Sequence, residues 1–251
     1  MGAMPAPTPT VVVGFDLDLT LVDSRERIMT SYLRALHDVG NPVTREDLEP
    51  HLGIPLTHTI AAVAPAVDAD ALVLLYRHYY DQASAPSTDP MPGALAAVRA
   101  LRAVGGRSVV VSAKFTPAAQ SALAEAGLDD LVDALHGELF ATEKATALIA
   151  EGATVYVGDH PGDMAAARAA GAVALGVATG ANDEAALTAA GADEVLASLE
   201  DFPAWLTAQP REQERKAEHQ GGCCGLGCRA QPEHQPAPGV VHPSMLGTPS
   251  V

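Results

Sequence analysis

Between residues 11 and 206 the chain alternates short apolar runs with Ala- and Leu-rich stretches, and this alternation limits the fold more than any other feature. The four strongest apolar runs have the composition of buried parallel strands: 11–16, 107–112, 154–159 and 172–177. Weaker strands are expected near 131–135 and 194–197. Helices are expected between the strands, over 93–104, 116–126, 143–151, 161–170 and 182–190. This order predicts an α/β fold with a doubly wound parallel sheet.

Residues 24–90 interrupt the alternation, because they contain no convincing strand. The apolar spacing predicts helices over 24–39, 45–51, 56–64 and 68–83, with Ser24 as the N-cap of the first. An insertion of this size must form its own small core, which favours a helical lid. The expected division is a discontinuous core domain of residues 11–23 and 91–207, a helical cap of residues 24–90, and a tail of residues 208–251.

The tail is charged at first, then Gly- and Cys-rich, and finally rich in Pro, His and Gln, so we expect it to be disordered. It holds all three cysteines, Cys223, Cys224 and Cys228, with His219 and His234 nearby. A soft metal site and an inert extension are both open. The spacing matches no paired Cys-x-x-Cys motif, which favours the inert extension.

The charge balance excludes some partners. Fifteen Lys and Arg against 31 Asp and Glu give a net charge of −16, which disfavours binding to nucleic acid or to anionic membranes. No run approaches the ~18 apolar residues of a membrane helix, and the first ten residues lack the pattern of a secretory signal. We therefore expect a cytoplasmic protein, whose oligomeric state the sequence leaves unknown.

Two acidic pairs follow expected strands. Asp16 and Asp18 end the first strand on one face, and Asp159 and Asp163 stand where the 154–159 strand passes into a helix. Ligands bind at the carboxyl edge of such sheets, and a hard cation such as Mg²⁺ would relieve the repulsion between the acids. Helix caps or solvated turns are the alternative interpretation for each pair.

The two lysines of the first 215 residues, Lys114 and Lys144, both lie near that expected edge. Arginine fills the other basic positions, so chance placement is the alternative. An ammonium group can serve as a point charge against a phosphate. Ser112 ends the 107–112 strand, where its hydroxyl could donate to a phosphate oxygen or cap the next helix.

In chain order, these segments resemble the motifs of the haloacid dehalogenase-like (HAD) superfamily. The resemblance runs from Asp16-x-Asp18-x-Thr20 through Ser112 and Lys144 to Gly158-Asp159 with Asp163, and it covers residues 11 to about 200. It implies a Rossmann-like core, and the helical insert looks like the type 1 cap of that family. Within the family, Ser112-Ala113-Lys114 and Met91-Pro92-Gly93 look like segments of the phosphoglycolate phosphatase-like group.

The resemblance also implies roles. Asp16 would be the nucleophile that forms an aspartyl-phosphate, and Asp18 the general acid and then the base. The residues expected to bind the substrate phosphate are Thr20, which would also orient the Asp16 region, Ser112, Lys114 and Lys144. Mg²⁺ would be bound by Asp16, by Asp18 through its backbone carbonyl, and by Asp159. Asp163 would support the site through Lys144.

The expected function is a Mg²⁺-dependent phosphatase that acts on a small phosphorylated metabolite, with phosphoglycolate as one possibility. Asp18 favours a phosphatase over a dehalogenase, because the dehalogenases of the family lack this acid. Leu19 and Ala113 depart from the pattern, since many relatives have Gly and Asn there. A phosphosugar mutase, a catalytically silent phospho-ligand-binding protein and a metal-handling protein that acts through the cysteine tail are the alternatives.

The cap would select the substrate. Its basic candidates for meeting the leaving group are Arg27, Arg45, Arg77, His51, His58 and His78. For each of them, a solvated helix face is the alternative. The stripe of Leu72, Leu75, Tyr76 and Tyr79 has the spacing of a helix face that packs in a core.

Overall fold

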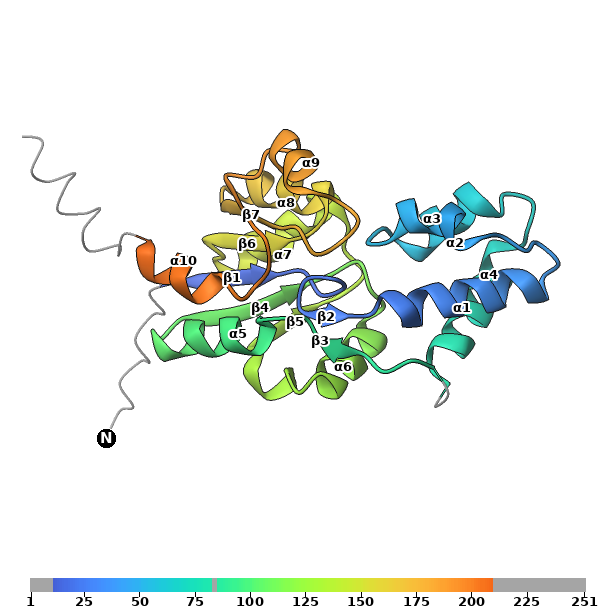
Figure 1. Ribbon diagram of the computed structural model, residues 1–251, viewed down its shortest axis with the longest axis horizontal. Helices are drawn as coiled ribbons and strands as arrows, with labels where there is room; N and C mark the ends of the chain where they lie inside the picture. The colour runs from blue at the N-terminus through green and yellow to red at the C-terminus, as the bar shows by residue number, and fades with distance from the viewer. Residues whose placement is uncertain (1–10, 83–84, 210–251) are drawn as a thin grey trace, which may run out of the picture. The chain divides into compact units, whose positions relative to one another are not determined.

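The computed structural model of the chain describes residues 11–82 and 85–209, which belong to one compact unit that ends at Gln209. The predictions for residues 210–251, including the cysteine cluster, lie outside the described residues. Figure 1 shows a sheet between two groups of helices and, beside them, a separate group of helices coloured blue to blue-green. In the part of the chain that the structure describes, no helix has the length and apolar character needed to cross a membrane.

The main sheet has six parallel strands in the order β5-β4-β1-β6-β7-β8. The strands are β1 (Val12–Phe15), β4 (Arg107–Val111), β5 (Ala134–His136), β6 (Val155–Gly158), β7 (Val173–Val177) and β8 (Glu194–Leu196). The central strand β1 pairs with β4 on one side and β6 on the other, so that Phe15 lies beside Val110 and Val157. Three strand ends therefore meet around the residues that follow Phe15.

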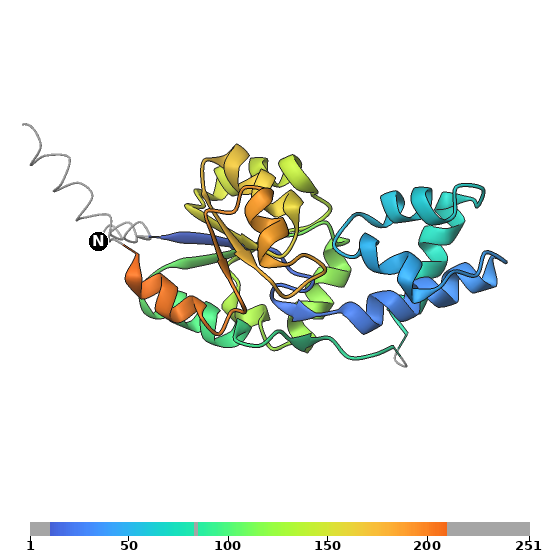
Figure 2. The same cartoon turned by 45° about the horizontal axis from the view of Figure 1, so that its top comes forward.

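Helices cover both faces of this sheet (Figures 1 and 2). One face packs on α5 (Ala94–Ala103), α6 (Thr116–Glu125) and α10 (Phe202–Ala208), and the other on α7 (Lys144–Glu151), α8 (Pro161–Ala170) and α9 (Glu184–Ala189). Successive strand side chains point to opposite faces, so Val110 packs in the first layer while Val109 and Val111 pack in the second. This arrangement confirms the predicted doubly wound α/β sheet.

The strand expected near 131–135 forms later in the chain than predicted. Residues Asp129–Leu131 make a short 3₁₀ helix, η2, and β5 begins only at Ala134. The cause is a pair of side-chain bonds: the Ser108 hydroxyl donates to the Leu131 carbonyl at 2.7 Å, and the Asp133 carboxylate accepts the Ser108 amide at 2.8 Å. These bonds tie residues 131–133 to the start of β4, where the Asp133 amide also donates to the Ser108 carbonyl at 2.8 Å.

The insert is helical, as expected. It contains α1 (Arg25–Asp38), α2 (Arg45–Leu48), the 3₁₀ helix η1 (Glu49–His51), α3 (Leu56–Val63) and α4 (Ala69–Tyr80). The single helix predicted over 45–51 is divided into α2 and η1, where Pro50 has no backbone N–H to donate. These helices bury a cluster of their own, which includes Met29, Leu36 and Leu72. The division into a core domain and a cap stays a prediction.

The two ends of the insert meet in a small antiparallel sheet. Strand β2 (Val22–Asp23) pairs with β3 (Asp89–Pro90), and the Met91 amide donates to the Leu21 carbonyl at 2.9 Å. A chain that leaves and returns through paired strands keeps the residues after β1 close to the main sheet. The loop that carries the first acidic pair is therefore fixed at both ends.

Candidate active site

Asp16 follows β1 directly and lies at the carboxyl edge of the sheet. Its amide donates to the Val157 carbonyl at 2.8 Å, so the ladder to β6 continues through it, and the residue is only 5% exposed. Burial raises the pKa of Asp16 to about 7, against the charge of Lys144 and with the help of the charges of Asp163 and Asp18. The expected nucleophile therefore sits at a position where its ionised form needs cationic partners.

Lys144 provides one such partner. It is the first residue of α7, it is buried, and its ammonium donates to Asp16 Oδ1 at 2.8 Å and to Asp163 Oδ1 at 2.6 Å. Burial acts to lower the pKa of Lys144, but the charges of the two acids outweigh it and hold the pKa well above its usual value. The predicted proximity of Lys144 to both acids is present in the structure.

Asp159 and Asp163 lie on either side of the entrance to α8. The Asp159 carboxylate accepts the Thr20 hydroxyl at 3.1 Å, and Asp163 also accepts the His160 amide at 3.1 Å, so Asp163 caps the helix as well as holding Lys144. The backbone of Gly180 approaches so closely that a Cβ there would lie 1.8 Å from Asp159 Oδ2. Only a glycine leaves room for this acid.

Three carboxylates form a buried cluster. Oxygens of Asp16, Asp159 and Asp163 all lie within 4.8 Å of one another, against the single ammonium of Lys144. Burial and the charges of the other two acids raise the pKa of Asp159 well above its usual value, although the Thr20 hydroxyl and Lys144 oppose this. Such an excess of buried carboxylate oxygen fits a hard divalent cation. The Asp18 carboxylate is not part of this cluster, and its expected metal contact through the backbone carbonyl stays a prediction.

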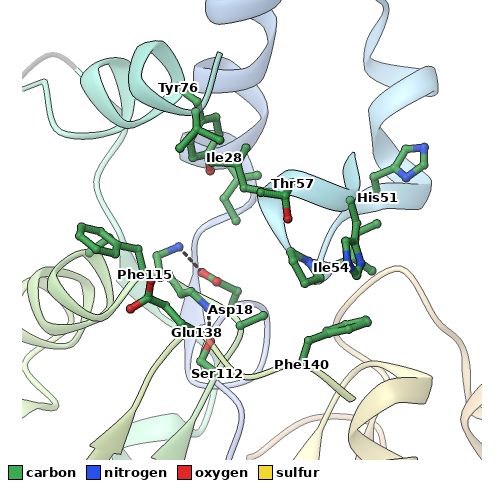
Figure 3. Close-up of a pocket in the computed structure, with 18 of the residues that line it drawn as sticks. Asp18, Ile28, His51, Ile54, Thr57, Tyr76, Ser112, Phe115, Glu138 and Phe140 are labelled. Atoms are coloured by element: carbon green, nitrogen blue, oxygen red, sulfur yellow. Dashed lines mark hydrogen bonds and ion pairs between the residues drawn. The ribbon is translucent and has the colours of Figure 1, made fainter. Parts of the chain in front are cut away.

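Asp18 lies beside this cluster and is held from two directions. The Lys114 ammonium donates to Asp18 Oδ1 at 2.8 Å, which is a dashed line at Asp18 in Figure 3. The Ser24 hydroxyl donates to the same oxygen at 2.5 Å. Burial acts to lower the pKa of Lys114, but the charge of Asp18 outweighs it and the pKa is raised. Ser24 occupies the N-cap position of α1, as predicted, but its side chain makes no capping bond because its hydroxyl donates to Asp18 instead.

Ser112 is buried at the end of β4, and its side chain does not cap α6. Its hydroxyl oxygen accepts the Lys114 amide at 3.2 Å, while the N-cap position of α6 is taken by Phe115. The neighbouring loop fixes this turn, because the Glu138 amide donates to the Lys114 carbonyl at 2.9 Å. Ser112, Lys114 and Asp18 thus face one space, in which Figure 3 labels Ser112 and Asp18.

That space is a pocket of about 570 Å³ between the sheet edge and the insert. Of the six basic candidates in the insert, Arg77, His51 and His58 line it. Arg27 is buried and paired with Glu125 instead, Arg45 is paired with Glu26 at the surface, and His78 is exposed and not part of the lining. Of the predicted packing stripe, Leu72 is buried in the insert's core, whereas Tyr76 also lines the pocket.

Several pocket residues were not anticipated. The main ones are Tyr80 and Asp81 at the end of α4, Phe115 before α6, and Glu138 and Phe140 after β5. Glu138 has a positive φ of 62°, which is uncommon for a residue with a side chain. These residues follow no motif in the sequence, and they come together only because the insert folds back onto the edge of the sheet.

Comparison with known proteins agrees with this geometry. A family model described as haloacid dehalogenase-like hydrolase matches residues 13–177. The phosphoglycolate phosphatase (plasmid) of Cupriavidus necator is 35% identical over 218 residues, which are 79% of this chain and 94% of that protein. The tyrosine-protein kinase PtkA of Mycobacterium tuberculosis is 31% identical over 134 residues, 53% of this chain and 46% of that protein.

A solved structure shares the fold. The crystal structure of a predicted phosphatase from Clostridium acetobutylicum superposes with a TM-score of 0.71 at 23% identity, and the match covers 80% of this chain and 100% of that one. The matched family model spans the acids at both strand ends and Lys144 between them. The chain therefore belongs to the haloacid dehalogenase-like hydrolase family, as a phosphatase-type member similar to phosphoglycolate phosphatases.

Proposed function

We propose that this protein is a Mg²⁺-dependent phosphatase that hydrolyses a small phosphorylated metabolite through an aspartyl-phosphate at Asp16. The observation that carries the proposal is the buried Asp16–Lys144 pair next to the Asp18–Lys114 pair at one end of a pocket. This arrangement puts a nucleophile, a second carboxyl group and two ammonium groups around one space. Phosphoryl transfer needs positioning and charge neutralisation of this kind.

In the first half-reaction, an Asp16 oxygen attacks phosphorus, the ester P–O bond breaks, and Asp18 gives its proton to the leaving oxygen. The Lys144 ammonium favours the ionised form of Asp16 and so opposes the effect of burial. A phosphate dianion would compete with Asp18 for the Lys114 ammonium, which allows Asp18 to take up a proton. The hydroxyl of Ser112, which also lines the pocket, would donate a hydrogen bond to a phosphoryl oxygen.

In the second half-reaction, Asp18 takes a proton from water, the oxygen attacks phosphorus, and the bond to Asp16 breaks to release phosphate. Asp16, Asp159 and the Asp18 carbonyl would hold Mg²⁺, with Asp163 close by. When bound, the ion would neutralise charge on the phosphoryl oxygens and help to align them with Asp16. Thr20 and Asp163 orient these groups through Asp159 and Lys144.

Phosphoglycolate is the first substrate to test, because the Cupriavidus necator relative carries that name. The substrate must reach Asp16 through a pocket lined by both insert and sheet residues. A phosphosugar mutase would instead need a bisphosphate to start turnover, and a silent binding protein would bind phosphate esters without releasing phosphate.

The decisive experiment measures phosphate release from a panel of phosphate esters, with Mg²⁺ and with EDTA. The Asp16→Asn variant should lose at least about 1,000-fold in kcat, since the nucleophile is gone. The matched control is Asp23→Asn, because Asp23 is an exposed acid seven residues further along the chain. Acid-quenched samples should carry a phosphoryl group on the peptide that contains Asp16. Turnover that survives Asp16→Asn, or folded protein that releases no phosphate from any ester, would contradict the proposal.

A further inference from the structure

Arg77 stands out among the pocket residues because its charge has no acidic partner among the residues that the structure describes. Its guanidinium lies over the Phe115 ring, 3.9 Å from the centroid, so a residue of α4 stacks on a residue of the sheet edge. Its Nε is buried and meets no hydrogen-bond acceptor within the described ranges, and none of the ion pairs found there includes Arg77. An unpaired buried donor costs free energy, and the cost is greater when the group is charged.

Tyr80 repeats this feature one helical turn later. The residue is only 3% exposed, and its hydroxyl finds no acceptor for its own proton in the part of the chain that the structure describes, although its oxygen interacts with the Lys114 ammonium. Its ring is fixed, because the Lys114 ammonium lies 4.5 Å and the Arg27 guanidinium 4.7 Å from its centroid. Residues three apart share a helix face, so both unpaired donors belong to the wall of the pocket that includes Asp18 and Ser112.

The rest of the lining does not satisfy these donors. Asp81 and Glu138 are acids of the same pocket, but neither forms an ion pair with Arg77 among the described residues. The lining also includes side chains with apolar surface, such as Ile28 and Tyr76, which Figure 3 labels. A pocket with apolar walls and a few unpaired donors orients one polar group of its ligand.

We propose that Arg77 and the Tyr80 hydroxyl bind a carboxylate on the leaving group of the substrate. The inference rests on the proposed phosphatase function and names the class of ester that the site takes. A planar guanidinium offers parallel N–H groups that match the two oxygens of a carboxylate, and the Phe115 stack fixes its plane. Arg77 is thus a specificity residue, and its role differs from that of Lys114 and Lys144, which would meet the phosphate.

Three esters of equal length test which group the pocket prefers on the leaving group. They are phosphoglycolate with a carboxylate, 2-hydroxyethyl phosphate with a neutral hydroxyl, and 2-aminoethyl phosphate with an ammonium. The wild-type kcat/KM should be at least about tenfold higher for phosphoglycolate than for the hydroxyethyl ester, because only the carboxylate pairs with Arg77. The ammonium ester should be the poorest of the three. These values are measured by continuous phosphate release in Mg²⁺.

The Arg77→Met variant keeps a long side chain over Phe115 but removes the charge and the donors. It should lose about tenfold or more in kcat/KM for phosphoglycolate and less than about twofold for the hydroxyethyl ester. Arg77→Lys should restore part of the carboxylate preference, and Tyr80→Phe should lose a smaller part. Arg34→Met is the matched control, because Arg34 lies over Tyr79 in the same insert but is exposed and outside the pocket lining.

Different results would overturn the inference. An equal loss for all three esters in Arg77→Met would mean that Arg77 only holds the insert against Phe115. A wild-type preference for the ammonium ester would assign recognition to Asp81 and Glu138 instead. Wild-type turnover of the hydroxyethyl ester without any carboxylate preference would refute the inference and leave the phosphatase proposal intact. If Asp16 is never phosphorylated and no ester is hydrolysed, the phosphatase proposal itself is refuted.

Discussion

Leu19 adopts a backbone conformation that most side chains avoid, directly after Asp18 in the candidate site. Its φ is 62°, yet the residue is only 1% exposed and packs with Ile28 and Met29 of α1. Its carbonyl accepts the Thr179 hydroxyl at 2.6 Å, so the loop is also held from the sheet side. The departure from glycine noted in the sequence therefore has a physical reason: burial of the leucine side chain offsets the strain of a left-handed backbone.

This balance predicts an unusual order of stability among variants at position 19. Leu19→Ala should lower the free energy of unfolding by about 2–5 kcal/mol, because the buried side chain is lost while the strain stays. Leu19→Gly should be about 1 kcal/mol less damaging, because glycine relieves the strain. Leu36, which is buried in the regular helix α1, is the control, and there Gly should be about 1 kcal/mol worse than Ala. Urea unfolding measures the stability of the four variants, Ala and Gly at positions 19 and 36. The same order of Ala and Gly at both positions would disprove the account.

At the scale of elements, one buried arginine joins α1 to α6. Arg27 donates to Glu125 Oε2 at 2.5 Å, to the Tyr80 carbonyl at 2.9 Å and to the Thr88 hydroxyl at 3.3 Å. In the sequence, Arg27 is one of the basic candidates for meeting the leaving group. In the structure, its side chain is used in packing between helices. The link fixes where α1 and α4 stand relative to the sheet, and hence where Arg77 and Tyr80 face the pocket.

The Arg27–Glu125 pair should make stability depend on pH. Burial acts to raise the pKa of Glu125, but hydrogen bonds and the charge of Arg27, with the Thr88 amide, outweigh it and lower the pKa. A lowered folded pKa means that the ionised form stabilises the fold above the ordinary glutamate value of about 4.3, and that this is lost as pH falls through the folded pKa. Glu125→Gln should therefore unfold more easily at pH 7.

The difference between Glu125→Gln and wild type should shrink as pH falls below about 4. Urea unfolding from pH 7 down to the lowest pH at which the protein stays folded measures it. Glu49→Gln is a suitable control, because the Glu49 pair with Arg25 is more exposed and should contribute little. A pH-independent difference between Glu125→Gln and wild type would assign the effect to packing rather than to charge.

For the molecule as a whole, the buried acids of the candidate site lower the free energy of unfolding. Burial and the charges of Asp16 and Asp163 raise the pKa of Asp159, so its ionisation at neutral pH costs folding free energy. The chain also has a net charge of −16, which adds repulsion that a bound cation would reduce. The protein should therefore be measurably more stable with Mg²⁺ than without it.

Thermal unfolding tests this coupling. Saturating Mg²⁺ at constant ionic strength should raise the wild-type Tm by several degrees, since ligand at 100 times its Kd adds about 2.7 kcal/mol. Asp159→Asn should unfold at a higher temperature than wild type in EDTA and should lose the response to Mg²⁺. Asp23→Asn, at an exposed acid, should respond as wild type does. An undiminished Mg²⁺ shift in Asp159→Asn would remove this residue from the proposed metal site.

The sequence alone determined the alternation of strands and helices, the helical nature of the insert and the acids at two strand ends. It could do so because these features are local: apolar periodicity defines each element, and parallel strands bring their carboxyl ends to one edge. Lys144 was identified by its position next to such a strand. The contact of Lys144 with both Asp16 and Asp163 then follows from α7 and α8 packing on the same face of the sheet.

Only the tertiary structure decided which side chains of the insert face the acids. Arg27, Arg45 and Arg77 look alike in the sequence. In the structure, the first is paired inside the molecule, the second is paired at the surface, and the third lines the pocket with no ion-pair partner among the described residues. The direction of an arginine on an amphipathic helix depends on how that helix is rotated against its neighbours. That rotation is set by packing between residues that lie far apart in the sequence, such as Leu19 with α1 and Arg77 with Phe115.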